Sequence, residues 1–282
     1  QKNNIDDNLW WSGEYNENAS LVICATEGFG DIFMFSRYLD FLDVAKFKEV
    51  ILIVPPALHD LFNFNFPGFK IVNMGKKVVY NFATILMDLP LIYNIDFEHI
   101  PSTDKYLIAP PEYFKNWKDF FNKDKLNVGI FFAGNTTNKR SLHNRKIDFE
   151  KLKPLFLLND VSFYSLQPED TYREACMMYN VTDLSDKITN FSDTAAIIEN
   201  LDLIISVDSA VAHLSGALGK KTFLMLPYSA DWRWFDDKAK CSWYDSVRIF
   251  KQEQEGNWNS VIAEIESEVK SLCAKEINSD TL

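Results

Sequence analysis

The chain has 282 residues, and 47% of them are hydrophobic, so it can bury a large core and is long enough for two domains. Its formal net charge of −11 leaves no basic surplus to neutralise a phosphate backbone, which argues against a nucleic-acid partner. No apolar run approaches the roughly 20 residues that a membrane-spanning helix needs, and no signal peptide is visible.

The four cysteines, Cys24, Cys176, Cys241 and Cys273, lie far apart in the sequence and form no Cys-x-x-Cys pair. This usage is typical of free thiols in a reducing compartment, so we expect a cytoplasmic protein. Because the first residue is Gln, we expect the chain to be a piece of a longer protein. The sequence predicts no transmembrane segment but leaves peripheral contact with a membrane open.

The first half of the chain alternates short apolar runs with helical patterns. We predict strands at residues 21–25, 50–54, 70–73 and 82–87, and helices at residues 32–47, 57–64 and 113–121. Polar residues at 122–125 form a linker pattern, so the domain boundary is placed there. The N-terminal domain would then cover residues 1–124.

The turn after the first predicted strand carries two glycines and an aspartate. Gly28 and Gly30 allow a tight turn and a close backbone approach, and Asp31 is well placed to cap the next helix. This is only half of a dinucleotide fingerprint, because Phe33 stands where a third Gly should be. The next strand offers no acidic residue for a nicotinamide ribose, so a nicotinamide-dependent enzyme is disfavoured.

The second half restarts the same alternation. We predict strands at residues 128–132, 161–166, 181–184, 203–207, 222–226 and 247–250, the last at a sheet edge, and helices at residues 149–158, 171–179, 192–200 (capped by Ser192) and 210–218. These elements make a C-terminal domain of residues 125–256, followed by a closing helix and tail at 257–282. The whole pattern predicts an α/β fold of two Rossmann-like domains facing across a cleft.

Residues 202–219 form a strand, a polar turn and a helix in direct succession. The turn at Asp208 and Ser209 would place backbone N–H groups and a helix N-terminus above the sheet, which suits an anion such as a phosphate. His213 lies four residues after Ser209 and therefore on the same helix face. The alternative is an ordinary crossover helix with a buried, hydrogen-bonded histidine.

The only dense basic cluster of this acidic chain follows the strand predicted at 128–132. It contains Lys139, Arg140, His143, Arg145 and Lys146. Basic residues at the carboxyl end of a parallel strand favour phosphate binding, although a solvated loop is the alternative.

Six short segments occur in an order that resembles a known family. They are Gly28-Phe29-Gly30-Asp31 with Phe35 and Arg37-Tyr38; Ala133-Gly134-Asn135 with the basic loop to Arg145; Ser165-Leu166-Gln167; Phe191-Ser192-Asp193-Thr194-Ala195; residues 206–214; and Pro227 with Asp231-Trp232-Arg233-Trp234. The series resembles the glycosyltransferase region found behind tetratricopeptide repeats in many bacterial proteins. That region is related to the ADP-heptose:lipopolysaccharide heptosyltransferases of glycosyltransferase family 9.

The resemblance spans residues 10–272 and implies a GT-B fold, an inverting mechanism without metal, and a nucleotide-sugar donor that is a substrate rather than a cofactor. Helical repeats would precede Gln1, and the acceptor hydroxyl would belong to a glycan, a lipopolysaccharide or a protein. Two alternatives stay open: a catalytically silent nucleotide-sugar-binding module attached to the repeats, and a nucleotide-sugar epimerase or hydrolase of the same fold.

The resemblance also implies residue roles. Asp31 is the expected catalytic base, because the resembling heptosyltransferases carry a catalytic Asp at this place, whereas its structural alternative is the helix cap. The expected donor-binding residues are Gly30, Asn135, Lys139, Arg140, Arg145, Gln167, Asp208, Ser209, Ala210, Val211 and His213. Contacts to the acceptor or the sugar are expected from Arg37, Asp231 and Trp232; the alternatives are a structural role for Arg37 and packing between domains for Trp232. No Asp-x-Asp motif occurs, so no metal ligands are predicted.

Overall fold

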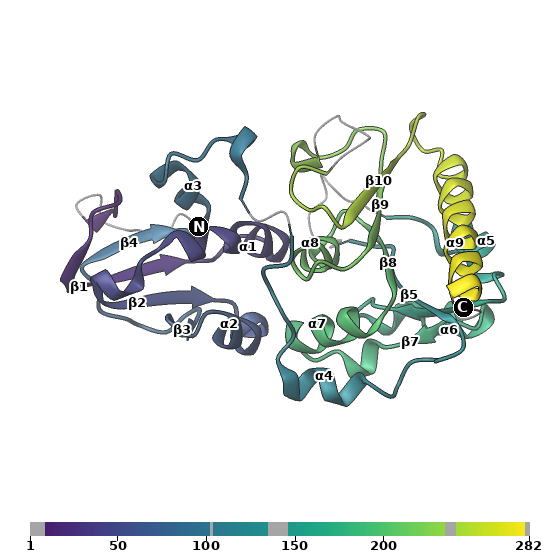
Figure 1. The fold of residues 1–282 in the computed structure, drawn as a ribbon, viewed down its shortest axis with the longest axis horizontal. Coiled ribbons are helices and arrows are strands. Elements are labelled where there is room, and N and C mark those ends of the chain that lie inside the picture. Colours follow the sequence, from purple (N-terminus) through teal and green to yellow (C-terminus); the bar gives the residue numbers. More distant parts are fainter. Residues whose placement is uncertain (1–8, 102–103, 135–145, 235–240, 280–282) are drawn as a thin grey trace.

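The computed structural model of the chain describes residues 9–101, 104–134, 146–234 and 241–279. These residues form two parallel β-sheets, one from each half of the sequence (Figure 1). The N-terminal sheet has the strand order β3-β2-β1-β4, with β1 at Asn16–Cys24, β2 at Phe47–Val54, β3 at Lys70–Asn73 and β4 at Phe82–Ile85.

The C-terminal sheet is larger and has the strand order β10-β9-β8-β5-β6-β7. Its strands are β5 (Leu126–Phe131), β6 (Val161–Ser165), β7 (Thr182–Asp183), β8 (Leu203–Val207), β9 (Thr222–Leu226) and β10 (Val247–Lys251). All neighbouring strands of both sheets pair in parallel, and β10 is an edge strand as predicted. The predicted α/β class with two Rossmann-like halves is confirmed.

Helices connect the strands, as parallel pairing requires. They are α1 (Phe29–Ser36), α2 (His59–Asn65), α3 (Leu89–Ile92), α4 (Pro111–Trp117), α5 (Lys153–Phe156), α6 (Arg173–Met178), α7 (Phe191–Asn200), α8 (Ala210–Ala217) and α9 (Asn259–Ser279). Short 3-10 turns occupy several of the remaining connections.

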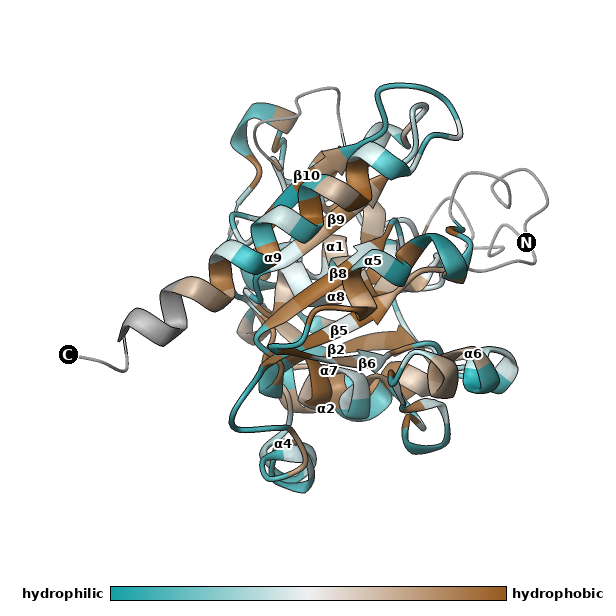
Figure 2. Cartoon of the chain, turned by 90° about the vertical axis from the view of Figure 1, so that its right-hand side faces the viewer, coloured by the Kyte–Doolittle hydropathy of each residue, from teal (hydrophilic) through white to brown (hydrophobic). Residues whose placement is uncertain are grey.

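Successive side chains of β8 and β9 point to opposite faces of the C-terminal sheet and are buried under helices on both faces. Ile204 and Leu224 belong to one buried cluster with residues of α7 and α8. Ile205 and Met225 belong to another, with residues of α5, α6 and α9. Figure 2 shows these apolar strands in the interior, with α9 crossing the outer face. Such two-sided burial explains why both strands are continuous apolar runs.

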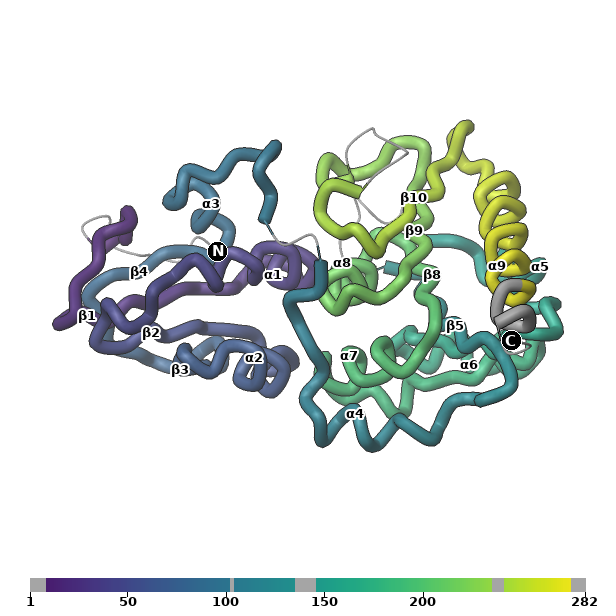
Figure 3. Tube along the Cα trace, viewed as in Figure 1, coloured from purple at the N-terminus to yellow at the C-terminus, as the bar shows by residue number. Residues whose placement is uncertain are grey.

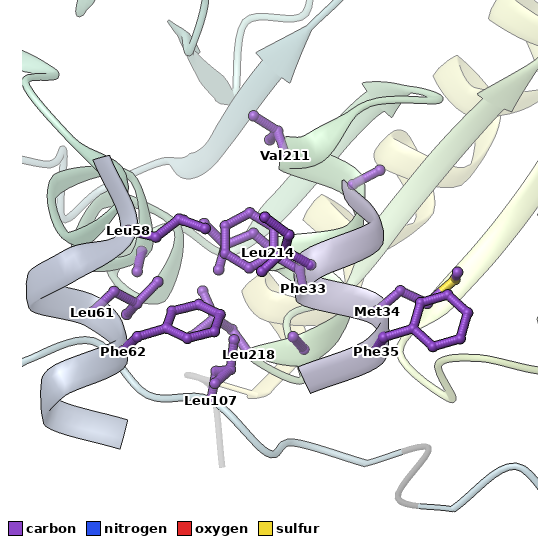
Figure 4. Close-up of a cluster of buried hydrophobic side chains, with 14 of the residues drawn as sticks. Phe33, Met34, Phe35, Leu58, Leu61, Phe62, Leu107, Val211, Leu214 and Leu218 are labelled. Carbon is purple, nitrogen blue, oxygen red and sulfur yellow. The ribbon is translucent and has the colours of Figure 1, made fainter. Parts of the chain in front are cut away.

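The two sheets do not stand apart, because helices from both halves share one core between them. α1 packs against α8, and α2 packs against α7. Figure 4 shows Phe33 of α1 and Phe62 of α2 beside Leu214 and Leu218 of α8. All four side chains belong to one continuous buried cluster. The halves are therefore joined by apolar packing as well as by the chain.

The connection between the halves also packs on the second one. Past residue 104 the chain runs down between the halves to α4 (Figure 3). On the way, Tyr106 N and Leu107 N both donate to Ala217 O at the end of α8, at 2.9 and 3.0 Å. α4 then packs against α7. The domain limits at 124/125 and 256/257 stay predictions.

Several local predictions differ from the structure; the strand predicted at 82–87, for example, ends at Ile85 and is followed by a 3-10 turn, Leu86–Asp88. The helix predicted at 32–47 ends as an α-helix at Ser36 and continues as a 3-10 turn, Arg37–Phe41. Its N-cap is Gly28, so Asp31 lies inside the first turn, and its carboxylate makes no capping bond. α7 is capped by Asn190, whose side chain accepts from Ser192 N and Asp193 N, because the helix begins one residue earlier than predicted.

Candidate functional site

A cavity of about 970 Å³ opens where the carboxyl ends of strands from both sheets meet. Its wall comprises residues that follow β1 and β2 in the N-terminal half and β5, β6, β8 and β9 in the C-terminal half. The carboxyl ends of parallel strands are where α/β proteins bind ligands. A second cavity, of about 900 Å³, lies between α5 and α9 and contains none of the predicted site residues.

The N-terminal wall comes from the turn after β1. Glu27, Gly28, Phe29, Gly30 and Asp31 all line the cavity, because β1 ends at Cys24 and α1 begins at Phe29. The Phe29 ring lies 4.7 Å, centroid to centroid, from the ring of Phe191 on α7 and forms an aromatic contact across the two halves.

The central polar contact of the cavity is an ion pair between the halves. Asp31 Oδ1 accepts from Arg233 Nε at 2.7 Å, and Arg233 Nη1 lies 2.7 Å from Asp231 Oδ1. The three side chains are only 18–23% exposed. Burial lowers the pKa of Arg233, but the hydrogen bonds and charges of Asp31 and Asp231 outweigh it, so that pKa lies above its ordinary value.

The opposite wall is the N-terminus of α8. Asp208, Ser209, Ala210 and Val211, the residues of the predicted donor-side turn, line the cavity. The Ser209 hydroxyl accepts from Ala212 N at 3.3 Å and lies 2.9 Å from Ser206 Oγ, which fixes the cap. A helix N-terminus with exposed backbone N–H groups attracts anions, so this wall can hold a phosphate.

His213 lies behind that turn and is both buried and at the cavity wall. Its Nδ1 lies 3.0 Å from the Tyr244 hydroxyl, its ring stacks on Trp234 at 4.7 Å, and the residue is 3% exposed. A Cβ added to Gly30 would lie 2.7 Å from His213 Cδ2. Glycine at position 30 therefore allows α1 to approach this histidine closely.

Two predicted site residues lie elsewhere. Arg37, expected at the acceptor, is fully buried, and its guanidinium donates to Met34 O at 2.9 Å and Trp243 O at 2.9 Å. Gln167, expected at the donor, is 1% exposed and uses its amide on the backbone of Phe132 and Ala133. Neither side chain lines the cavity, and both form hydrogen bonds to backbone atoms elsewhere.

Asp231 and Trp232, both predicted on the acceptor side, differ in their position relative to the cavity. Asp231 lines the cavity and holds Arg233. Trp232 is 57% exposed and does not line the cavity, but the Arg233 guanidinium carbon lies 4.8 Å from its ring centroid. The ring therefore covers the ion pair from outside.

Asn135, Lys139, Arg140 and Arg145 lie outside the described residues. Gly134, the residue before them, lines the cavity at the carboxyl end of β5. Their predicted role with the donor therefore stays a prediction.

Two residues that line this cavity, Glu27 and Arg233, are absent from the predicted site residues. Burial raises the pKa of Glu27, and the charges of Asp31 and Asp88 raise it further against two lowering backbone hydrogen bonds. Arg233 lies in the quoted Asp231-Trp232-Arg233-Trp234 segment but was given no role. The sequence signal for Glu27 is its place directly before the turn Gly28-x-Gly30-Asp31.

Within the parts of the chain that the structure describes, no group of three or more His, Cys, Asp or Glu side chains is arranged to hold a metal ion. In the same parts, no helix is both long enough and apolar enough to cross a membrane.

Two Rossmann-like sheets whose carboxyl ends share a cavity define the GT-B architecture. Residues 170–231, which contain α7, β8 and the α8 turn, match the model of "Glycosyltransferase family 9 (heptosyltransferase)". The match and the fold together support a glycosyltransferase.

Individual proteins are similar over almost the whole chain. Protein FlbA of Caulobacter vibrioides is 24% identical over 94% of this chain, which spans only 48% of FlbA. The E. coli ADP-heptose lipopolysaccharide heptosyltransferase II is 11% identical, with a TM-score of 0.62 over 91% of this chain and 99% of that one.

Two further solved structures share the fold. A glycosyl transferase family 9 protein from Veillonella parvula is 9% identical, with a TM-score of 0.65 over 94% of this chain and 100% of that one. The dodecameric glycosyltransferase TibC of enterotoxigenic E. coli is 12% identical, with a TM-score of 0.58 over 94% of this chain and 78% of that one, and it contains iron. At these identities the likeness concerns the fold.

Proposed function

We propose that this chain is an inverting, metal-independent glycosyltransferase that moves a sugar from a nucleoside-diphosphate sugar to an acceptor hydroxyl. The observation that carries the proposal is the shared cavity, where the Asp31 carboxylate of one half faces the α8 N-terminus of the other. A base for the acceptor and an anion site for the leaving group are the two groups that such a transfer needs.

On the donor side, the diphosphate binds at the N-terminus of α8. The backbone N–H groups of Ala210 and Val211 bind it together with Ser209 and His213. The likeness to an ADP-heptose transferase supports a nucleoside diphosphate as the leaving group. The basic residues Lys139, Arg140 and Arg145, with Asn135, add charge-assisted contacts worth about 1.5–3 kcal/mol each. Asp208 braces the turn or a donor hydroxyl.

On the acceptor side, Asp31 acts as the general base. Within the described residues this carboxylate is hydrogen-bonded through Oδ1, to Arg233 Nε, and not through Oδ2. Oδ2 takes the acceptor proton, the hydroxyl oxygen attacks the anomeric carbon, and the bond to the diphosphate oxygen breaks. The electron pair leaves with the diphosphate, and the anomeric configuration inverts.

The acceptor is a hydroxyl of a glycan, a lipopolysaccharide or a protein, and the enzyme works in the cytoplasm, where nucleotide sugars are made. Residues 1–124 present the base and the acceptor, residues 125–256 hold the donor, and residues 257–282 close the second half. The nucleotide sugar is a substrate, and the transfer needs no further cofactor.

The test is a thermal-shift panel of nucleoside diphosphates and nucleotide sugars, with and without EDTA, followed by a transfer assay with the donor that binds. A ligand at about one hundred times its Kd should stabilise the native protein by about 2.7 kcal/mol. Ser209→Trp should abolish that shift, because the indole fills the space beside the α8 N-terminus.

Asp31→Asn should keep the donor shift and lower the transfer rate by about 10²–10⁴-fold, the usual contribution of a general base. Full activity of this variant would remove Asp31 as the base. Donor binding without any transfer would favour the silent binding module, and donor turnover without acceptor would favour the epimerase or hydrolase. Loss of transfer in EDTA, restored by added iron or another divalent ion, would overturn metal independence.

A further inference from the structure

Arg233 is the feature of the cavity that the proposed chemistry leaves unused. Among the described residues that line the cavity, it alone is a Lys or Arg. It comes from the C-terminal half, on the 3-10 turn Trp232–Trp234 after β9, and reaches a carboxylate 202 residues away in the N-terminal half. An ion pair of this kind connects the two walls directly.

The turn that carries Arg233 is fixed at several points. Trp234 is 1% exposed and stacks on His213. Trp243 Nε1 donates to Arg233 O at 2.6 Å, and Arg233 N donates to Asp231 Oδ1 at 3.2 Å. The guanidinium therefore has little freedom, and its place is set by the C-terminal half.

The contact also determines what Asp31 can do. Arg233 Nε occupies Oδ1 at 2.7 Å, while the other oxygen, Oδ2, lies beside Gly28 at the entrance of α1. A carboxylate held by one oxygen has its second oxygen aimed in a fixed direction. Fixing a reacting group in this way is worth large rate factors, because a misplacement of about 1 Å costs on the order of 10²-fold.

We propose that Arg233 is a positioning residue for the Asp31 carboxylate, supplied by one half of the molecule to the base of the other. The inference rests on the proposed function, since it takes Asp31 as the base. Arg233 neither accepts the acceptor proton nor binds the donor; it orients Oδ2 and is itself oriented by Asp231. The base is thus assembled only where the two halves pack together.

The experiment compares Arg233→Gln, Arg233→Lys and Arg233→Ala with the wild type by kcat, KM for both substrates and donor thermal shift. Arg248→Gln is the matched control: Arg248 also pairs with two carboxylates, Glu264 and Glu268, and lies over an aromatic ring, but it is outside the cavity. We expect Arg233→Gln to lower kcat by about 10²-fold with donor Kd and KM within about threefold. Arg248→Gln should keep wild-type kcat.

Two readouts separate positioning from a structural role. Millimolar guanidinium should restore part of the kcat of Arg233→Ala and none of that of Asp31→Asn. Arg233→Gln placed in an Asp31→Asn background should cause no further loss, because the group it positions is already gone. If Arg233→Gln fails to fold, Arg233→Lys should fold and lose about tenfold, since an ammonium cannot bridge Asp31 and Asp231 with a planar fork.

Each failure has a distinct signature. A wild type that binds no nucleotide sugar, or an Asp31→Asn variant of full activity, overturns the proposed function. A wild-type kcat in Arg233→Gln or Arg233→Lys overturns positioning alone. A donor Kd that rises as kcat falls would also overturn positioning, because it would assign Arg233 to the diphosphate. Losses that multiply when Arg233→Gln is combined with Asp31→Asn would overturn it as well.

Discussion

The two carboxylates that follow β1 have different environments although they are four residues apart. Asp31 is held by the Arg233 guanidinium. Within the described residues Glu27 forms no ion pair with a Lys or Arg, and its Oε2 accepts from Thr26 N at 2.9 Å. Burial therefore dominates at Glu27 and raises its pKa.

This difference predicts a pH-dependent stability effect. Because the pKa of Glu27 is higher in the folded chain than in the unfolded one, its stabilising contribution is present below the unfolded pKa and is lost as pH rises through the folded one. Glu27→Gln should therefore be more stable than the wild type at pH 7, and the gain should vanish near about pH 4, around the ordinary Glu pKa.

Urea denaturation of both proteins across this pH range measures the effect. Glu49→Gln is a suitable control, since Glu49 is a surface residue paired with Lys70 and lies outside the cavity. A Glu27→Gln variant that is less stable than the wild type at neutral pH would show that the carboxylate is compensated by contacts other than those described.

At the scale of elements, the position of α8 depends on two glycines. Gly30 of α1 faces His213, and a Cβ on Gly216 of α8 would lie 2.3 Å from Tyr244 Cγ. Tyr244 in turn is fully buried and contacts His213 through its hydroxyl. Close approach at both points sets the distance between α1, α8 and the segment that carries Tyr244.

Gly216→Ala should therefore destabilise the protein, although alanine is the better helix former by about 1 kcal/mol. Overpacking of a buried contact costs about 1–3 kcal/mol, and a Cβ 2.3 Å from a buried ring atom belongs at the upper end of that range. After the gain in helix propensity, we expect a net loss of about 2 kcal/mol in the free energy of unfolding. Gly28→Ala is the control, because its Cβ would meet only Asp31 Oδ2 at an ordinary 3.5 Å. Equal stability of the two variants, measured by urea denaturation, would contradict this account of the packing.

At the scale of the whole molecule, the two halves share one buried core. The largest buried cluster contains residues of both sheets and of the four helices α1, α2, α7 and α8 between them. The buried Arg37 adds a polar link across the halves by donating to Trp243 O, and it also donates to Pro101 O and Tyr106 Oη within the N-terminal half. Separate unfolding of either half would expose this shared apolar surface.

We therefore expect a single cooperative thermal transition. Leu214→Ala should lower the free energy of unfolding by about 2–5 kcal/mol, because Leu214 is fully buried in the shared cluster, and should keep one transition. Leu157→Ala, at a leucine that is 64% exposed, should change the free energy by less than about 0.5 kcal/mol. Two resolved calorimetric transitions, or protection from hydrogen exchange lost in only one half, would contradict a shared core.

The sequence by itself determined the elements whose signal is local. β8 and β9 are found at the predicted residues, and α8 differs from its prediction by one residue at its end. Apolar runs between turn residues, followed by a polar cap, carry enough information within one window to specify strand, turn and helix. The α/β class and the location of the cavity beside Gly30, Asp31 and Ser209 follow from the same signals.

Only the tertiary structure decided what the polar side chains of the site contact. Arg37 and Gln167 look like ligand-binding residues in the sequence, but distant backbone carbonyls and amides occupy them. Arg233 received no role, because its partner Asp31 is 202 residues away. Hydrogen bonds and burial depend on neighbours in space, and no spacing along the chain records which of them meet when the two sheets share a core.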